Sequence, residues 1–112
     1  MRNRDYSAFL QAIRKKYNFD FVSIALVVQR PRPLLSWISA SGNQNQYYHD
    51  IVLESGKGIA GNAYQAKRGI LINSVQEELS GMDLVETPII LAENLASLLA
   101  LPLWKEDQVE GV

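Results

Sequence analysis

The sequence predicts an α+β domain with a central, mostly antiparallel sheet flanked by helices. Segments rich in β-branched residues follow one another with short turns between them, and strands joined in this way pair as antiparallel hairpins. Stretches with the helical spacing of apolar residues stand before and between these segments. The length of 112 residues suits one hydrophobic core, so we expect a single domain over residues 1–112.

The first part of the chain predicts one helix and one hairpin. Apolar residues fall at helical spacing over residues 5–17, ahead of a core that we expect to span about residues 19–112. The β-branched stretch at 19–29 predicts a central strand. Prolines in Arg30-Pro31-Arg32-Pro33 lack the N–H that a ladder needs, so the chain turns there. Alternate side chains along residues 34–41 would face opposite sides of a sheet, and this pattern predicts the returning strand.

The middle of the chain predicts short elements separated by glycines and polar residues. We expect residues 47–53 to be extended, although the type of element that they form is ambiguous from the sequence. Glycines then introduce a short helix over about 58–67, which we expect Gly69 to end. Residues 70–72 predict a strand, and 73–86 predict a mobile crossing loop with one helical turn, because they are polar.

The last part predicts a helix and a hairpin. Thr87 and Pro88 favour a helix start, because threonine can cap free backbone N–H groups and proline at the first helical position has no donor to leave unpaired. We expect this helix to cover 88–95 and a strand to follow over 97–104. A returning strand begins at Val109 and the chain ends within it, so we expect a truncated C-terminal strand.

Composition excludes several classes of function. Eleven basic and twelve acidic residues give a net charge of −1, which provides no global field for nucleic acid or an anionic membrane. The absence of cysteine excludes disulfides, thiolate nucleophiles and zinc ribbons, and one histidine cannot build a usual metal site alone. No segment has the apolar length of a signal peptide or a membrane span, so we expect a cytoplasmic protein without metal or cofactor.

Enzyme signatures are weak. Gly56-Lys57-Gly58-Ile59-Ala60-Gly61 matches the dinucleotide-binding pattern, but no βαβ unit surrounds it. A tight entry from a strand into a helix explains the same glycines. The chain has no Gly-x-Ser-x-Gly elbow, and its acidic residues lie in polar segments. We therefore expect a binding protein and not an enzyme.

Three segments in this order stand out: Glu54-Ser55-Gly56-Lys57-Gly58-Ile59-Ala60-Gly61-Asn62-Ala63, then Gly69-Ile70-Leu71-Ile72-Asn73, then Leu98-Leu99-Ala100-Leu101-Pro102-Leu103. With them the sequence resembles a GAF domain over nearly the whole chain. This resemblance implies a PAS-like fold, and the missing final strand and helix are the main departure. A tryptophan on the second strand, Gly58-Ile59-Ala60 at one helix start and Pro88-Ile89 at the next look like the nitrate-receptor GAF proteins. Those receptors regulate an oxygen-sensing histidine kinase of a two-component system in Gram-positive bacteria.

The resemblance also implies a site. Trp37, Ile59, Ala60, Pro88 and Ile89 would line a small anion pocket, with backbone amides at both helix starts as donors. The ligand-binding residues are thus Trp37, Gly58, Ile59, Ala60, Thr87, Pro88 and Ile89. Thr87 stands where that family has an aromatic residue. A helix N-terminus can hold an anion without lysine or arginine, and an apolar wall favours a weakly hydrated anion such as nitrate.

The sequence thus predicts a ligand-sensing domain that binds nitrate, modulates a sensor histidine kinase and can form a homodimer. The alternatives are a GAF domain for another small molecule, such as a cyclic nucleotide or metabolite, and a ligand-free dimerisation module in which Trp37 is plain core. The methionine-sulfoxide reductases of this fold need redox cysteines, which this chain lacks. We expect the loop 73–86 to change with ligand.

Overall fold

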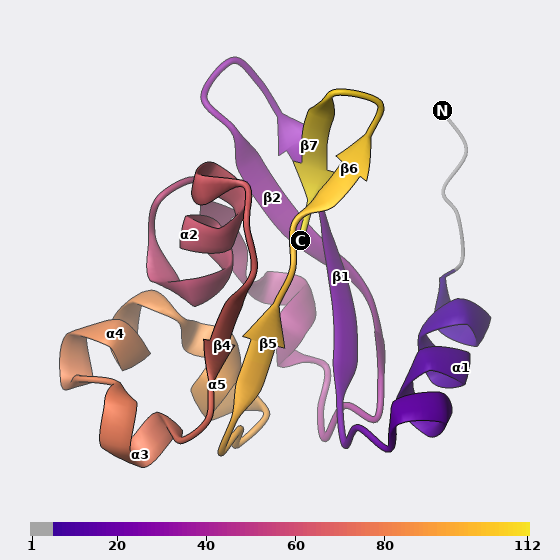
Figure 1. Ribbon diagram of the computed structural model, residues 1–112, viewed down its shortest axis with the longest axis vertical. Helices are drawn as coiled ribbons and strands as arrows, with labels where there is room; N and C mark the ends of the chain where they lie inside the picture. The colour runs from indigo at the N-terminus through magenta and orange to yellow at the C-terminus, as the bar shows by residue number, and fades with distance from the viewer. Residues whose placement is uncertain (1–5) are drawn as a thin grey trace.

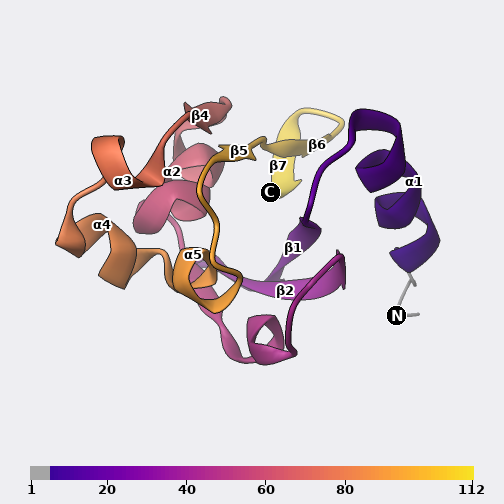
Figure 2. The ribbon, with the colours of Figure 1, turned by 90° about the horizontal axis from the view of Figure 1, so that it is seen from below.

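The computed structural model describes residues 6–112, and the predicted helix start at Asp5 lies outside them. A five-stranded antiparallel sheet with the order β3-β2-β1-β7-β6 forms the centre, and β4 and β5 form a separate antiparallel pair. Helix α1 lies on one side of β1 and the other helices lie on the opposite side (Figures 1 and 2). The elements are α1 (Ser7–Tyr17), β1 (Val22–Gln29), β2 (Leu34–Ser41), the 3-10 helix η1 (Tyr47–Asp50), β3 (Val52–Glu54), α2 (Gly58–Ala66), β4 (Ile70–Ile72), α3 (Val75–Glu78), α4 (Gly81–Glu86), α5 (Pro88–Ala92), β5 (Leu98–Ala100), β6 (Leu103–Lys105) and β7 (Gln108–Gly111).

The hairpin of β1 and β2 is the centre of the sheet, as the sequence predicts. Its register places Val22 opposite Ser41, and β2 follows the predicted alternation, with Leu35, Trp37 and Ser39 buried. Two consecutive residues of β1, Ile24 and Ala25, are both buried. A register irregularity lies between these two residues, and helices lie on both sides of this strand, so both of its faces are covered.

The predicted returning strand is confirmed as β7, which lies between β1 and β6. Ala25 and Val112 exchange both backbone hydrogen bonds, each with an N to O distance of 2.9 Å. The last strand in sequence is therefore next to the central strand in space. The fold class predicted from the sequence, α+β with a mostly antiparallel sheet, is confirmed.

The segment 73–86 is not the crossing loop with one helical turn that its polarity suggests. It forms two short helices, α3 and α4, because serines cap both. Ser74 Oγ accepts from the Glu77 amide at 3.2 Å, and Ser80 forms a capping box with Asp83. Polar side chains at helix starts replace solvent as partners of the backbone, so a polar segment can be helical.

Other boundaries also differ from the sequence-based prediction. The single strand predicted over 97–104 is two strands, β5 and β6, which belong to different sheets. Helix α2 is ended by Lys67, which adopts a left-handed conformation with φ 61°, and not by Gly69. Helix α5 stops at Ala92, three residues early, because the chain turns through Glu93 and Asn94. The ambiguous stretch 47–53 contains the 3-10 helix η1 as well as the beginning of β3.

The main core lies between the sheet and the helices of the second half. It contains side chains from the sheet, from η1, from α2 and from α5, among them Leu35, Trp37, Tyr48, Ala63, Ile89 and Ile90. Within residues 6–112 no helix is long and apolar enough to span a membrane.

Candidate functional site

A cleft of about 980 Å³ extends from α1 past the beginning of β1 to β5 and reaches the inner ends of α2 and α5. Its mouth is mostly apolar, with Phe9, Phe21 and Leu101 among the lining side chains. Its inner wall is made by Trp37, Ile59, Ala60, Thr87 and Ile89, all of them buried. The cleft is thus mainly apolar on its inner wall, and polar residues such as Asp20, Gln44 and Asn94 also line it.

Trp37 provides the one buried indole donor in the described part of the chain. Its side chain is 8% exposed, and its Nε1 is shielded from solvent without a hydrogen-bond acceptor among residues 6–112. Burying an N–H without an acceptor costs about 1–3 kcal/mol, so such groups are rare in folded proteins. A bound group that offers an acceptor to this atom would recover that cost.

The start of α2 is held by a side chain from far along the sequence. Thr87 Oγ1 accepts a hydrogen bond from the Ile59 amide, with an N to O distance of 3.0 Å across 28 residues. Thr87 is 2% exposed and makes no side-chain cap on α5, so the prediction that it caps its own helix is wrong. The Ile59 amide, expected as a donor to the anion, already has this partner.

Gly58 explains why the two segments can approach. It has φ +70°, and a Cβ at this position would overlap the Glu86 carbonyl and lie 2.8 Å from Thr87 Oγ1. Only a residue without a side chain fits here, because both the left-handed backbone and the contact exclude a Cβ. Gly58 therefore positions α2 against the junction of α4 and α5.

The predicted site residues separate into two groups. Trp37, Ile59, Ala60, Thr87 and Ile89 lie together on the inner wall of the cleft. Gly58 is buried but packs against Thr87, and Pro88 is exposed; neither lines the cleft. The chain fold thus brings the second strand and two helix starts to one place.

Glu93 is a cleft residue that the sequence analysis misses. It is 3% exposed, its Oε1 accepts from the Gln44 amide at 2.7 Å, and its buried Oε2 has no partner among the described residues. It follows Ile89 and Ile90 by four and three positions, which places it on the same buried face of the turn. This spacing is the signal that could have found it.

The remaining charged groups lie away from the inner wall. Lys57 and Glu54 form an exposed ion pair with an N to O distance of 2.8 Å. The hydrogen bond and charge of Lys57 lower the pKa of Glu54, and Glu54 in turn raises the pKa of Lys57. Within residues 6–112 no group of three His, Cys, Asp or Glu side chains could hold a metal ion. The inner wall therefore offers neutral donors and one carboxylate.

Comparison with solved structures gives strong similarities. A hypothetical protein from S. aureus is 34% identical, with a TM-score of 0.88 over 96% of this chain and 88% of that chain. A mutated NreA protein, altered in its nitrate binding site and from the same organism, is also 34% identical, with a TM-score of 0.88 over 95% of this chain and 79% of that chain. Both similarities extend over nearly the whole chain.

More distant structures share the fold alone. The GAF domain of an Acinetobacter phosphoenolpyruvate-protein phosphotransferase is 15% identical, with a TM-score of 0.67 over 94% of this chain and 60% of that chain. Free methionine-R-sulfoxide reductases match at 15 to 20% identity. No protein-family model matches the sequence, and no curated protein matches it.

Proposed function

Because this chain belongs to the GAF-domain family that includes NreA, we propose that it is a sensor that binds a small anion, nitrate first among them. The chain forms one GAF domain, which acts in the cytoplasm, modulates a partner sensor histidine kinase and catalyses no reaction. The observation that carries this proposal is that Trp37 is one of the residues lining the cleft and that its buried Nε1 has no acceptor among the described residues. An anion oxygen is the acceptor that would satisfy it.

The chemistry of the inner wall favours a weakly hydrated anion. No lysine or arginine lines the cleft, so the ligand must leave water for neutral donors and apolar side chains. Nitrate pays a smaller desolvation cost than chloride or sulfate, and the walls formed by Ile59, Ala60 and Ile89 reject the strongly hydrated anions. The start of α2 adds partial positive charge at the same wall.

Thr87 supplies a second neutral donor in this proposal. A hydroxyl has one hydrogen and two lone pairs, and one lone pair of Thr87 Oγ1 receives the Ile59 amide. The hydroxyl hydrogen stays available to an anion oxygen on the cleft side. Thr87 thereby replaces the occupied Ile59 amide as the donor, and a smaller residue than the aromatic one expected here leaves room for the anion.

Glu93 restricts where the anion binds. Thr87 precedes α5 and Glu93 follows it, so about 9 Å of helix separate them at 1.5 Å per residue. A carboxylate repels an anion, and this repulsion weakens with distance. We therefore place the anion at the Trp37 and Thr87 end of α5.

The volume of the cleft favours a second candidate. About 980 Å³ is far more space than nitrate fills and is within the range of cyclic nucleotide or metabolite pockets. A larger ligand would contact the apolar mouth as well as Trp37. A ligand-free dimerisation module is the third possibility, in which Trp37 is a core residue only.

Isothermal titration with nitrate, chloride, sulfate and cyclic GMP tests the proposal. We expect saturable nitrate binding that weakens about tenfold or more in Trp37→Phe, because the ring is retained and the N–H donor is lost, a loss of about 1.5–3 kcal/mol. The matched control is Trp104→Phe, since Trp104 is 53% exposed on β6 and lies outside the cleft.

Other outcomes separate the candidates. If the titration gives binding heat with cyclic GMP and none with nitrate, the larger ligand is favoured. If a folded protein gives no binding heat with any of the four ligands, the dimerisation module is favoured. The kinase part of the proposal is tested separately, by autophosphorylation of the purified kinase with and without this protein and nitrate; an unchanged rate removes that part.

A further inference from the structure

Helix α4 carries apolar side chains that the molecule leaves uncovered. Met82 is 66% exposed and Val85 is 72% exposed, and their spacing of three residues puts them on one side of the helix. Leu91, on the adjoining α5, is 67% exposed. Exposed apolar residues that gather on neighbouring helices, ringed by charge, are typical of protein interaction sites.

The charges that residues 69–104 contribute here have one sign, and Lys57 is a basic residue that interacts electrostatically with Glu86. Residues 69–104 contain five acidic residues and no lysine, arginine or histidine, although the whole chain has nearly equal numbers of both signs. Four of the five are on or between α3 and α4 and are exposed or partly exposed: Glu77, Glu78, Asp83 and Glu86. We call these four, with Met82 and Val85, the acidic face.

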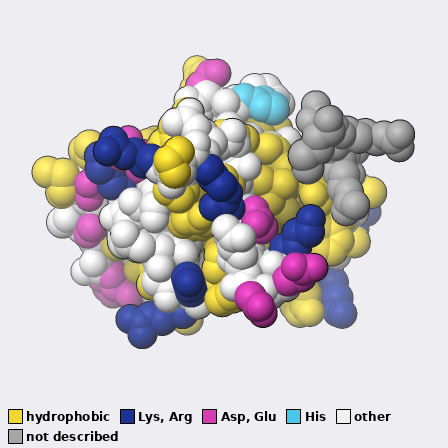
Figure 3. Space-filling model, turned by 90° about the horizontal axis from the view of Figure 1, so that it is seen from above, with side chains coloured by type: hydrophobic (Ala, Val, Ile, Leu, Met, Phe, Trp, Pro, Cys, Tyr) yellow, Lys and Arg dark blue, Asp and Glu magenta, His cyan; other side chains and the backbone are white. Residues whose placement is uncertain are grey.

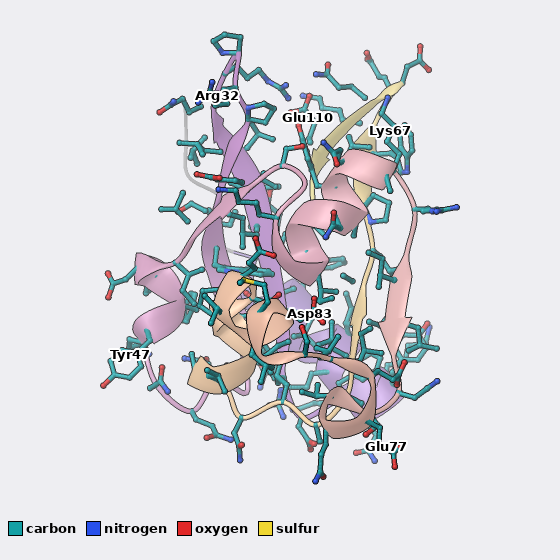
Figure 4. The ribbon with its side chains drawn as sticks, turned by 90° about the vertical axis from the view of Figure 1, so that its left-hand side faces the viewer. Arg32, Tyr47, Lys67, Glu77, Asp83 and Glu110 are labelled. Atoms are coloured by element: carbon teal, nitrogen blue, oxygen red, sulfur yellow. The ribbon has the colours of Figure 1, made fainter. Side chains whose placement is uncertain are left out.

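The rest of the surface differs from the acidic face. Figure 3 shows basic and acidic side chains interspersed over the side of the molecule seen from above. In Figure 4, Glu77 and Asp83 lie in the lower half of the view, and Arg32, Lys67 and Glu110 lie in its upper half, where Arg30 and Glu110 form an ion pair of 3.1 Å. The charged side chains on α3 and α4 themselves, in contrast, are all acidic.

Helix α1 has the complementary character. Its last turn contains Arg14, Lys15 and Lys16 and no acidic residue. Arg14 is half-buried and donates to Ser41 Oγ at 2.9 Å, whereas Lys15, Lys16 and Tyr17 are exposed, Tyr17 to 59%. We call Lys15, Lys16 and Tyr17 the basic face. It combines apolar area with positive charge, as the acidic face combines apolar area with negative charge.

One molecule cannot join its own two faces. Helix α1 lies on one side of β1, and α3 and α4 lie on the other side, in both ribbon views (Figures 1 and 2). We propose that the acidic face of one copy docks the basic face of a second copy of this chain. This inference concerns a surface outside the cleft and does not rest on the proposed function.

The proposed contact is heterologous, because two different surfaces meet. Such contacts extend into open chains unless the rotation closes a ring, so association should rise with protein concentration without stopping at a dimer. Exposed charges are screened over about 8 Å at physiological salt, so high salt should weaken the contact. The apolar side chains at both faces retain part of it.

Analytical ultracentrifugation of the ligand-free protein tests the inference. We expect self-association at low salt that weakens by roughly tenfold at high salt. Glu77→Lys with Glu86→Lys changes the acidic face without touching the serine caps of α3 and α4, and Lys15→Glu with Lys16→Glu changes the basic face. Each double variant alone should be monomeric, with circular dichroism and a Tm like those of the parent protein.

The mixture of the two variants is the decisive experiment. Each retains one parental face, so an equimolar mixture should form a 1:1 dimer that cannot extend. A parent protein that is monomeric at every concentration and salt tested overturns the inference. So does association that only the α1 variant abolishes, which indicates a symmetric contact of α1, or a mixture that stays monomeric.

Discussion

The starts of α2 and α4 show two ways of completing a helix. Helix α4 begins with Ser80, which satisfies the Asp83 amide three residues later and is exposed. Helix α2 begins with a residue that makes no side-chain cap, and its Ile59 amide is satisfied by Thr87 from 28 residues away, in the interior. The local cap tolerates change, whereas the remote one ties together two segments and the wall of the cleft.

Gly58→Ala should produce the largest effect on this remote cap. The new Cβ meets the Glu86 carbonyl in a left-handed backbone, so we expect a loss of about 3 kcal/mol or more in the free energy of unfolding, measured with urea. The matched control is Gly81→Ala at the start of α4, where nothing lies within 4 Å of the added Cβ. This control should stay within about 1 kcal/mol of the parent protein or gain stability. Equal losses in both variants would contradict the special role of Gly58.

Thr87→Val should come second. Valine has nearly the same shape but leaves the buried Ile59 amide without its acceptor, which costs about 1–3 kcal/mol. Thr87→Ser retains the hydroxyl and loses only a methyl group, at about 1 kcal/mol. Urea unfolding of both variants decides the point: a serine variant that is less stable than the valine variant would show that the methyl group, and not the hydrogen bond, is what matters.

Ser80→Ala removes the local cap of α4. The expected loss is about 1 kcal/mol, because water can replace an exposed cap. Hydrogen exchange should accelerate in α4 and stay unchanged at the Ile59 amide. Faster exchange at Ile59 would mean that the two helix starts are coupled after all.

The exposed pair at the start of α2 should have the smallest effect, and Lys57→Met tests it. Because Lys57 lowers the pKa of Glu54, the contribution of ionised Glu54 to the stability of the fold is present above pH 4.5 and is lost as the pH falls through its lower folded pKa. Because Glu54 raises the pKa of Lys57, the contribution of protonated Lys57 to the stability of the fold is present below pH 10.5 and is lost as the pH rises through its higher folded pKa.

The Tm difference between the parent protein and Lys57→Met should therefore be small near neutral pH and vanish at both extremes, with Lys105→Met as the control outside this pair. A difference that grows toward acid would contradict this assignment. Solvent screens exposed charges, which is why this pair ranks last.

Local signals explain what the sequence predicts correctly. The β-branched run of β1 and the alternation of β2 follow from residues that touch immediate neighbours in the hairpin. The serines at 74 and 80, each with an acidic residue three positions later, are also local signals. The prediction of a loop with one helical turn over 73–86 gave more weight to polarity than to this spacing.

The sequence by itself determined the first helix, the central hairpin, the absence of thiol chemistry and the residue types at the two helix starts, since each depends on neighbours along the chain. Only the tertiary structure decided that Thr87 serves α2 and not α5, that Trp37 Nε1 lacks an acceptor, and that Glu93 is buried beside the cleft. These facts depend on residues tens of positions apart, which meet only after the chain closes its loops, and no local pattern encodes such a meeting.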